Sequence, residues 1–134
     1  MMWVIDTSAL IRLFVPDGPL HPEVETAFNR AASGTDLVLA PQLLLAEAAN
    51  VLLRKQRRGE LSAQELRDLL HAVEALPIRY CGHESLLLAA CALADTHGLT
   101  AYDALYLALA EHHGARLITS NEILEKVART IGLA

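Results

Sequence analysis

Cysteine is scarce in this sequence, and long hydrophobic runs are missing. Cys81 and Cys91 are the only cysteines among 134 residues, and their spacing matches no metal-binding motif. Two cysteines are too few for a disulfide framework, so we expect reduced thiols in a cytoplasmic protein. No apolar run reaches the ~20 residues of a membrane span. Asp6 and Arg12 interrupt the amino-terminal apolar stretch and no small-residue cleavage site follows, so we expect no signal peptide and no membrane association.

The sequence also has no excess of positive charge. The formal net charge is −5 at pH 7, with 11 lysines and arginines against 16 acidic residues. This balance argues against a protein that holds nucleic acid by electrostatic attraction alone. Four of the basic residues nevertheless fall within the five positions from Arg54 to Arg58.

Internal repeats and low-complexity segments are absent as well. The chain is close to the commonest domain size, so we expect one domain over residues 1–134. Apolar residues, counted with the 7 glycines and without the 3 tyrosines, make up about 56% of the sequence, more than the roughly 45–50% typical of soluble domains. The surplus is enough to cover part of a partner surface.

The sequence does contain four short apolar runs, each followed by a helical pattern. The runs are residues 3–5, 37–40, 78–81 and 116–119. Strands that alternate with helix-length segments predict an α/β fold, with a parallel sheet covered on its faces by helices.

Five helices are predicted from apolar periodicity and from capping signals. They cover residues 41–58, 61–76, 83–98, 100–114 and 121–130. The first opens with Pro41 at a helix start. The second carries a capping box of Ser62 and Glu65, and Gly98 separates the third from the fourth. Residues 14–19 are predicted to form a turn-rich loop.

Two acidic residues stand where apolar residues are expected. Asp6 directly follows the first apolar run, at the strand end where ligands collect in open parallel sheets. Its alternative role is to cap the next helix. Glu47 shares a helix face with Leu43, Leu44 and Val51, so it is expected to be at least partly buried. A buried ion pair with Arg54 is as good an explanation of Glu47 as a functional role.

Two further polar residues occupy similar positions. Asp103 lies in the first turn of a predicted helix, where it serves either as a ligand or as the acid of a capping box with Thr100. Asn121 follows the last predicted strand, as Asp6 follows the first. Its alternative role is also capping, and Thr119 with Glu122 supplies another possible capping box.

Taken together, these four residues can converge at one end of the sheet. Carboxylates crowded there repel one another unless a divalent ion holds them. An oxygen-only ligand set without cysteine or histidine favours Mg²⁺ or Mn²⁺.

Four segments in this order resemble the PIN-domain family, in particular its compact VapC-type toxin ribonucleases. They are VIDTSAL, PQLLLAEAANVLLR, TAYDALYLALA and LITSNEIL, and together they span essentially the whole chain. The resemblance implies a three-layer α/β/α sandwich with a short parallel sheet. It also implies Mg²⁺-dependent RNA cleavage, a homodimer and inhibition by a cognate antitoxin.

The resemblance assigns the family's acidic set to Asp6, Glu47 and Asp103, and its hydroxyl after the first aspartate to Thr7. Thr119 is a further candidate for a supporting hydroxyl. The family's fourth acidic position falls on Asn121, where this sequence departs from the pattern. An amide oxygen still ligates a metal ion, so Asn121 is retained as a candidate ligand.

The predicted reaction is hydrolysis of RNA phosphodiester bonds. Asp6 and Asp103, with Asn121, are expected to bind the metal, and Glu47 is expected to hold or deprotonate the attacking water. Arg54 and Arg58 are the candidate contacts to RNA, although a solvated helix end explains them too. The competing hypothesis is a non-catalytic PIN-like binding module or scaffold, weakened at Asn121.

Overall fold

Four short strands form one sheet in which all neighbours run parallel. The computed structural model describes residues 1–134, and its strands are β1 (Met2–Ile5), β2 (Leu37–Pro41), β3 (Arg79–Cys81) and β4 (Arg116–Ile118). Their spatial order is β3-β2-β1-β4. In the central strand, Val4 pairs with Leu39 on one side and with Leu117 on the other. The carboxyl ends of all four strands therefore meet at one edge.

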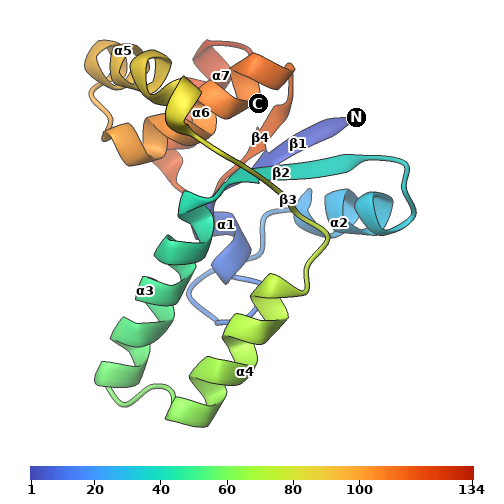
Figure 1. Cartoon of the computed structure of the whole chain (residues 1–134), viewed down its shortest axis with the longest axis vertical. Helices are drawn as coiled ribbons and strands as arrows, with labels where there is room; N and C mark the ends of the chain where they lie inside the picture. Colours follow the sequence, from blue (N-terminus) through green and yellow to red (C-terminus); the bar gives the residue numbers. More distant parts are fainter.

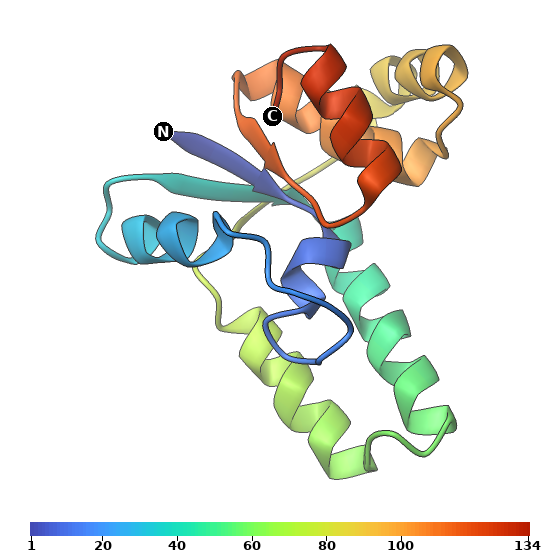
Figure 2. The same cartoon turned by 180° about the vertical axis from the view of Figure 1, so that it is seen from behind.

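Helices cover both faces of this sheet. They are α1 (Thr7–Ile11), α2 (Val24–Ala32), α3 (Leu43–Arg57), α4 (Ala63–Glu74), the short 3₁₀ helix η1 (Glu84–Leu86), α5 (Leu87–His97), α6 (Ala101–His113) and α7 (Glu122–Thr130). Helices α5 to α7 lie on one side of the sheet and α1 to α4 on the other (Figures 1 and 2). The predicted three-layer α/β/α sandwich is confirmed.

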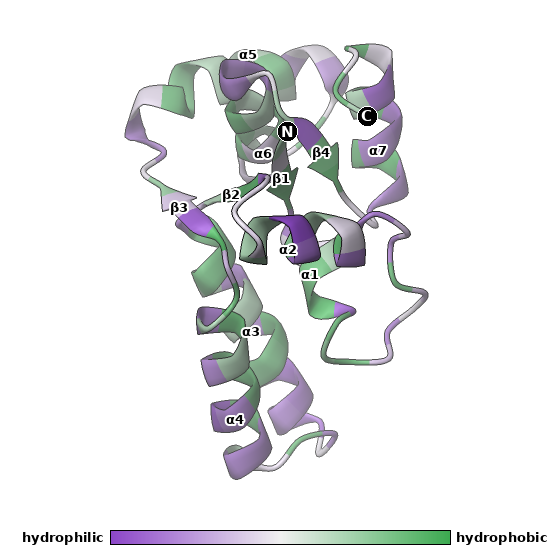
Figure 3. Ribbon diagram, turned by 90° about the vertical axis from the view of Figure 1, so that its right-hand side faces the viewer, coloured by the Kyte–Doolittle hydropathy of each residue, from purple (hydrophilic) through white to green (hydrophobic).

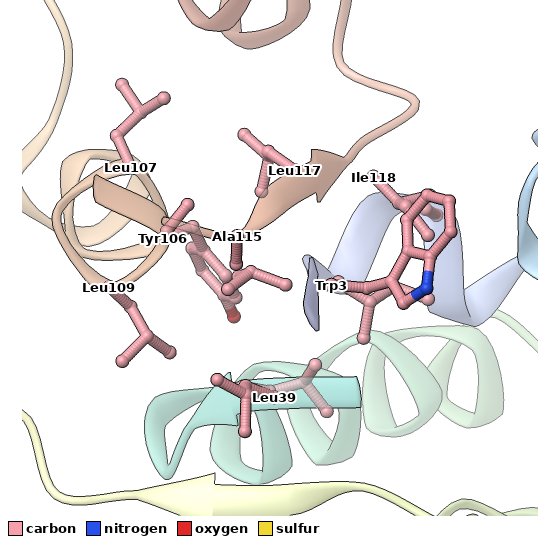
Figure 4. Close-up of a cluster of buried hydrophobic side chains, with 14 of the residues drawn as sticks. Trp3, Leu39, Tyr106, Leu107, Leu109, Ala115, Leu117 and Ile118 are labelled. Atoms are coloured by element: carbon pink, nitrogen blue, oxygen red, sulfur yellow. The ribbon is translucent and has the colours of Figure 1, made fainter. Parts of the chain in front are cut away.

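The core lies between β1 and α6. Trp3, Val4 and Ile5 of β1 are buried, and so is every residue from 104 to 110 of α6. Strands covered on both faces have continuous apolar runs rather than alternating ones, which explains the runs in the sequence. Figure 3 shows the hydrophobic character of β1 and β4, and Figure 4 shows the buried cluster around Tyr106 and Leu117. None of the helices is both long enough and apolar enough to cross a membrane.

The structure confirms two helix-end signals and corrects two predicted boundaries. The capping box of Ser62 and Glu65 is present, and Gly98 ends α5 with a left-handed φ of 68°. Pro41 does not start a helix but ends β2; it has no N–H, and the ladder to β3 continues through the next residue, whose N–H donates to Cys81 O. The helix expected at residues 83–98 begins as η1 and becomes α-helical at Leu87.

Helix α2 was not predicted. Only Val24 and Ala27 are buried in it, so its apolar pattern is short and weak. The turn-rich segment at residues 14–19 does connect α1 to α2 without regular structure, as expected.

Candidate active site

A pocket of about 410 Å³ opens beside the carboxyl end of β1. Its wall contains all three predicted acids, Asp6, Glu47 and Asp103, together with Asn121. These residues come from four different parts of the sequence. The pocket is also lined by Thr7 and Arg54, the supporting hydroxyl and one of the two candidate RNA contacts. Thr119 is hydrogen-bonded to Asp6. Arg58 lies outside the pocket, so its contact with RNA stays a prediction.

Asp6 is held in place from three directions. It is the N-cap of α1, and its Oδ1 accepts hydrogen bonds from Ala9 N at 3.0 Å and from Ser8 Oγ at 2.7 Å. The Thr119 hydroxyl donates to Oδ2 at 2.5 Å. The capping role considered for Asp6 is therefore present, in the same side chain that lines the pocket.

The environment of Asp6 opposes its negative charge. The residue is only 5% exposed. Burial raises the pKa of Asp6 to about 6, against the lowering effect of its hydrogen bonds, and the nearby Asp103 carboxylate adds to the rise. A cation bound at this position would relieve both effects.

Glu47 projects from α3 and is fixed by two neutral hydroxyl groups. Tyr106 Oη donates to Glu47 Oε1 at 2.5 Å, and Thr7 Oγ1 donates to the same oxygen at 3.0 Å. The alternative explanation of Glu47, an ion pair with Arg54 or another base, does not hold, because Glu47 belongs to none of the four ion pairs of the chain. Glu47 Oε2 has no hydrogen-bond partner in the protein and is free to bind a ligand.

Asp103 lies in the first turn of α6, and only half of the considered capping box forms. Thr100 Oγ1 accepts a hydrogen bond from Asp103 N at 3.1 Å, but the Asp103 carboxylate makes no return bond to the N-cap backbone. Burial raises the pKa of Asp103. The carboxylate thus has no structural partner within the helix cap.

Asn121 is the N-cap of α7. Its Oδ1 accepts hydrogen bonds from Ile123 N at 3.0 Å and from Leu124 N at 3.1 Å. Two backbone donors identify this atom as the amide oxygen, so Nδ2, a hydrogen-bond donor, is the remaining polar atom. The other capping box, with Thr119, does not form, because Thr119 Oγ1 accepts from Asn121 N and donates to Asp6.

The structure adds two residues that the sequence did not indicate. Ser8 supports Asp6, and Tyr106 packs in the core and also donates a hydrogen bond to Glu47. Burial, reinforced by the Glu47 carboxylate, raises the pKa of Tyr106, so its hydroxyl stays protonated and remains a donor. The available signal was the position of Tyr106, one helical turn after Asp103.

The donor set fits a hard divalent ion. No histidine or cysteine lines the pocket, and none of its three predicted acids pairs with a cation. No three acidic, histidine or cysteine side chains approach closely enough to form a ready-made metal centre. Mg²⁺ commonly uses one or two carboxylates and keeps several waters, so it suits this arrangement better than an ion that needs a full protein cage.

Comparison with known proteins agrees with the fold. A model of the PIN domain matches residues 3–130. The chain therefore belongs to the PIN domain family.

The relatives of this chain include ribonucleases of the VapC type. It is 35% identical over 131 residues to Ribonuclease VapC3 of Pyrobaculum aerophilum, covering 94% of this chain and 95% of that protein. It is 33% identical over 123 residues to Ribonuclease VapC3 of Mycobacterium tuberculosis, covering 92% of this chain and 85% of the relative.

Two crystal structures share the fold. The Pyrobaculum aerophilum protein PAE2754 superposes with a TM-score of 0.72 at 24% identity, covering 95% of this chain and 84% of the other. VapC20 of Mycobacterium tuberculosis, a toxin that cleaves the sarcin-ricin loop, superposes with a TM-score of 0.67 at 16% identity, covering 98% and 96%.

Proposed function

We propose that this protein is a Mg²⁺- or Mn²⁺-dependent endoribonuclease that hydrolyses RNA phosphodiester bonds as the toxin of a toxin–antitoxin pair. The observation that carries the proposal is the convergence of Asp6, Glu47 and Asp103 in one pocket without any cationic partner. The ribonuclease names of the two VapC3 relatives support RNA as the substrate.

In this proposal the three acids have different tasks. Asp6 and Asp103 hold the metal ion, which would neutralise the charge that develops on the phosphate oxygens. Glu47 orients the attacking water and accepts its proton through the free Oε2. Thr7 and Tyr106 keep the carboxylate of Glu47 in place through Oε1. No protein atom forms a covalent bond with the substrate.

Ser8 and Thr119 serve as positioning residues for Asp6. Their hydroxyl groups fix the rotation of the carboxylate without neutralising its charge. The charge of Asp6 therefore remains available to the metal ion.

Substitution of the metal-binding acids tests the proposal. We expect Asp6→Asn and Asp103→Asn each to abolish RNA cleavage while circular dichroism shows an intact fold. Mg²⁺ or Mn²⁺ should raise the Tm of the wild type but not of these variants, because ligand binding stabilises the folded state. Asp68→Asn makes the same chemical change at an exposed position of α4 and should behave like the wild type. Full cleavage in excess EDTA would contradict the proposal.

We extend the proposal to two protein partners, a second copy of the chain and a small cognate antitoxin. The first is supported by exposed leucines on α5. The second is supported by the VapC name of the two relatives, because the VapC-type toxins that the sequence resembles have a cognate antitoxin. A tagged protein purified from its native host should carry a small partner that inhibits cleavage. Purification without such a protein, at full ribonuclease activity, would count against the antitoxin.

A further inference from the structure

The pocket contains positive as well as negative charge, and the two do not pair. Arg12 and Arg54 line the same pocket as the three predicted acids. The four ion pairs of the chain involve other cations, namely the amino terminus, Lys55, Arg116 and Arg129. Neither arginine therefore supports the fold through an ion pair, and both are available to a ligand.

Two helices place these charges at opposite ends. Asp6 and Arg12 are the N-cap and C-cap of α1, about 9 Å apart along the axis at ~1.5 Å per residue. Glu47 and Arg54 are separated in the same direction along α3, by about 10 Å. Both helices start at the carboxyl edge of the sheet and extend away from it side by side (Figure 1).

A small apolar cluster fixes the two helices against each other. Its buried members are Ile11, Val15 and Leu52, which join the end of α1 to the middle of α3. The acids therefore lie at the sheet end of the pocket, and the arginines lie at the far end.

The Arg12 side chain is held in position before any ligand binds. Its Nη1 donates to Pro19 O at 3.2 Å, and the guanidinium lies so close to Gly18 that a Cβ there would be 2.7 Å from Arg12 Cζ. Asp17, the acid nearest this end, is bound instead by Lys55 Nζ at 2.6 Å. The guanidinium groups are thus free of carboxylates although Asp17 lies in the same wall.

We propose that Arg12 and Arg54 form a phosphate-binding subsite, which holds RNA backbone phosphates that flank the cleaved bond. The inference rests on the proposed ribonuclease function and adds a second recognition point to it. A guanidinium fork matches the geometry of phosphate oxygens and binds them through charge-assisted hydrogen bonds. The distance from the acids places this contact on a neighbouring phosphate and not on the reacting one.

Cleavage kinetics with two substrates test the subsite. With a single-stranded oligoribonucleotide, Arg12→Gln and Arg54→Gln should each raise KM roughly tenfold and leave kcat nearly unchanged, because the lost contact is made equally in the ground and transition states. A dinucleoside monophosphate has no flanking phosphate, so the variants should cleave it like the wild type. Arg57→Gln removes an exposed cation of α3 outside the pocket and is the matched control.

Binding without cleavage gives an independent measurement. In EDTA, the anisotropy of a labelled oligoribonucleotide gives the binding constant at increasing KCl. The slope of log K against log[KCl] should decrease in magnitude by about 0.7 for each arginine removed. Arg12→Lys keeps the positive charge and serves as a control for a folding defect in Arg12→Gln. It should have the wild-type salt slope but only part of the wild-type affinity, because lysine lacks the guanidinium fork.

The possible results separate the two proposals. If the wild type cleaves RNA and the arginine variants keep its KM and its salt slope, the subsite is wrong and the ribonuclease proposal stands. If the arginine variants lose no more affinity than Arg57→Gln, general surface charge explains the binding and the subsite is again wrong. If the wild type neither cleaves nor binds RNA, both proposals fail.

Discussion

Neutral hydroxyl groups, and not cations, hold the two acids at the centre of the pocket. Thr7 and Tyr106 bind Glu47, whereas Ser8 and Thr119 bind Asp6. A lysine or arginine at these positions would also fix the carboxylates, but it would compete with a metal ion for their charge. Hydroxyl donors give orientation without that competition.

The hydroxyl of Tyr106 can be removed with little change in packing. We expect Tyr106→Phe to lower kcat by on the order of tenfold or more, because Glu47 loses one of its two anchors and its position becomes less certain. KM for RNA should stay close to the wild-type value, and an unchanged circular dichroism spectrum and Tm should show that the variant is folded. Tyr102→Phe, on the same helix but 61% exposed, is the control. Equal kcat values for the two variants would contradict a role of Tyr106 in positioning Glu47.

Asn121 allows a test of the departure from the family pattern. Asn121→Asp keeps the helix cap, since both residues are good N-caps, and puts an oxygen in place of Nδ2. We expect tighter Mg²⁺ or Mn²⁺ binding by calorimetry and faster cleavage at limiting metal, with a smaller gain at saturation. In EDTA the stability should change by well under the ~1 kcal/mol of a lost cap. Identical metal affinities would mean that Asn121 acts only as a cap.

At this scale the sequence indicated the acids and two of their supports, Thr7 and Thr119, but not Ser8 and Tyr106. Asp6 and Glu47 were recognisable because a charge in an apolar setting is unusual in any sequence. Serine and tyrosine are common in every environment, and the only sequence signal that separates Tyr106 from Tyr102 is its position one helical turn after Asp103. Their difference comes from tertiary packing, which buries Tyr106 and aims it at α3.

At the scale of whole elements, the starts of several helices bring the site together. Asp6 caps α1, Asn121 caps α7, and Asp103 lies in the first turn of α6. Three of the helices that supply the pocket follow strands of a parallel sheet, so their first turns meet at one edge. Strand order could not be read from the runs themselves, whereas their common direction could.

Helix α5 is apolar, but most of its side chains are not buried by the rest of the protein. Of its eleven residues only Ala90 is fully buried, and Leu87 and Leu88 are 46% and 85% exposed. We propose this leucine pair as part of the contact between two copies of the chain. Exposed apolar side chains next to one another are typical of protein interfaces.

Substitution of one leucine tests the contact. Leu88→Glu should shift the protein from dimer to monomer in sedimentation experiments at micromolar concentration, because a buried unpaired carboxylate opposes association. Ile123→Glu makes a similar change at an isolated apolar residue of α7, 67% exposed, and should leave the dimer intact. A wild type that is monomeric at these concentrations would contradict the proposal.

On the scale of the whole molecule, the two ends of the sheet each contain a buried acid, and the surroundings shift the two pKa values in opposite directions. Asp36 and Asp6 are both 5% exposed. Trp3 Nε1 donates to Asp36 at 2.9 Å, and this bond lowers the pKa of Asp36. Burial raises the pKa of Asp6 to about 6. One acid supports the fold, whereas the charge of the other works against it.

The pH dependence of stability follows from the raised pKa. In the folded chain Asp6 binds its proton more tightly than in the unfolded chain, so it favours folding most below about pH 4, and this contribution is lost as the pH rises through about 6. Without divalent ions at alkaline pH, Asp6→Asn should therefore be the more stable protein, by up to about 3 kcal/mol. The advantage should vanish in acid. Urea unfolding in EDTA across this range measures it, with Asp68→Asn, the same change at an exposed position, as the control.

The opposite charges at the two ends of the pocket have a consequence for the substrate. A groove with acids at one end and arginines at the other has a direction, as an RNA strand does from 5′ to 3′. A strand can then satisfy both ends in only one polarity. The shortest oligonucleotide cut at full rate should extend from the cleaved bond on one side only, and trimming the other side should cost nothing. In that case the products themselves would reveal which way the RNA lies.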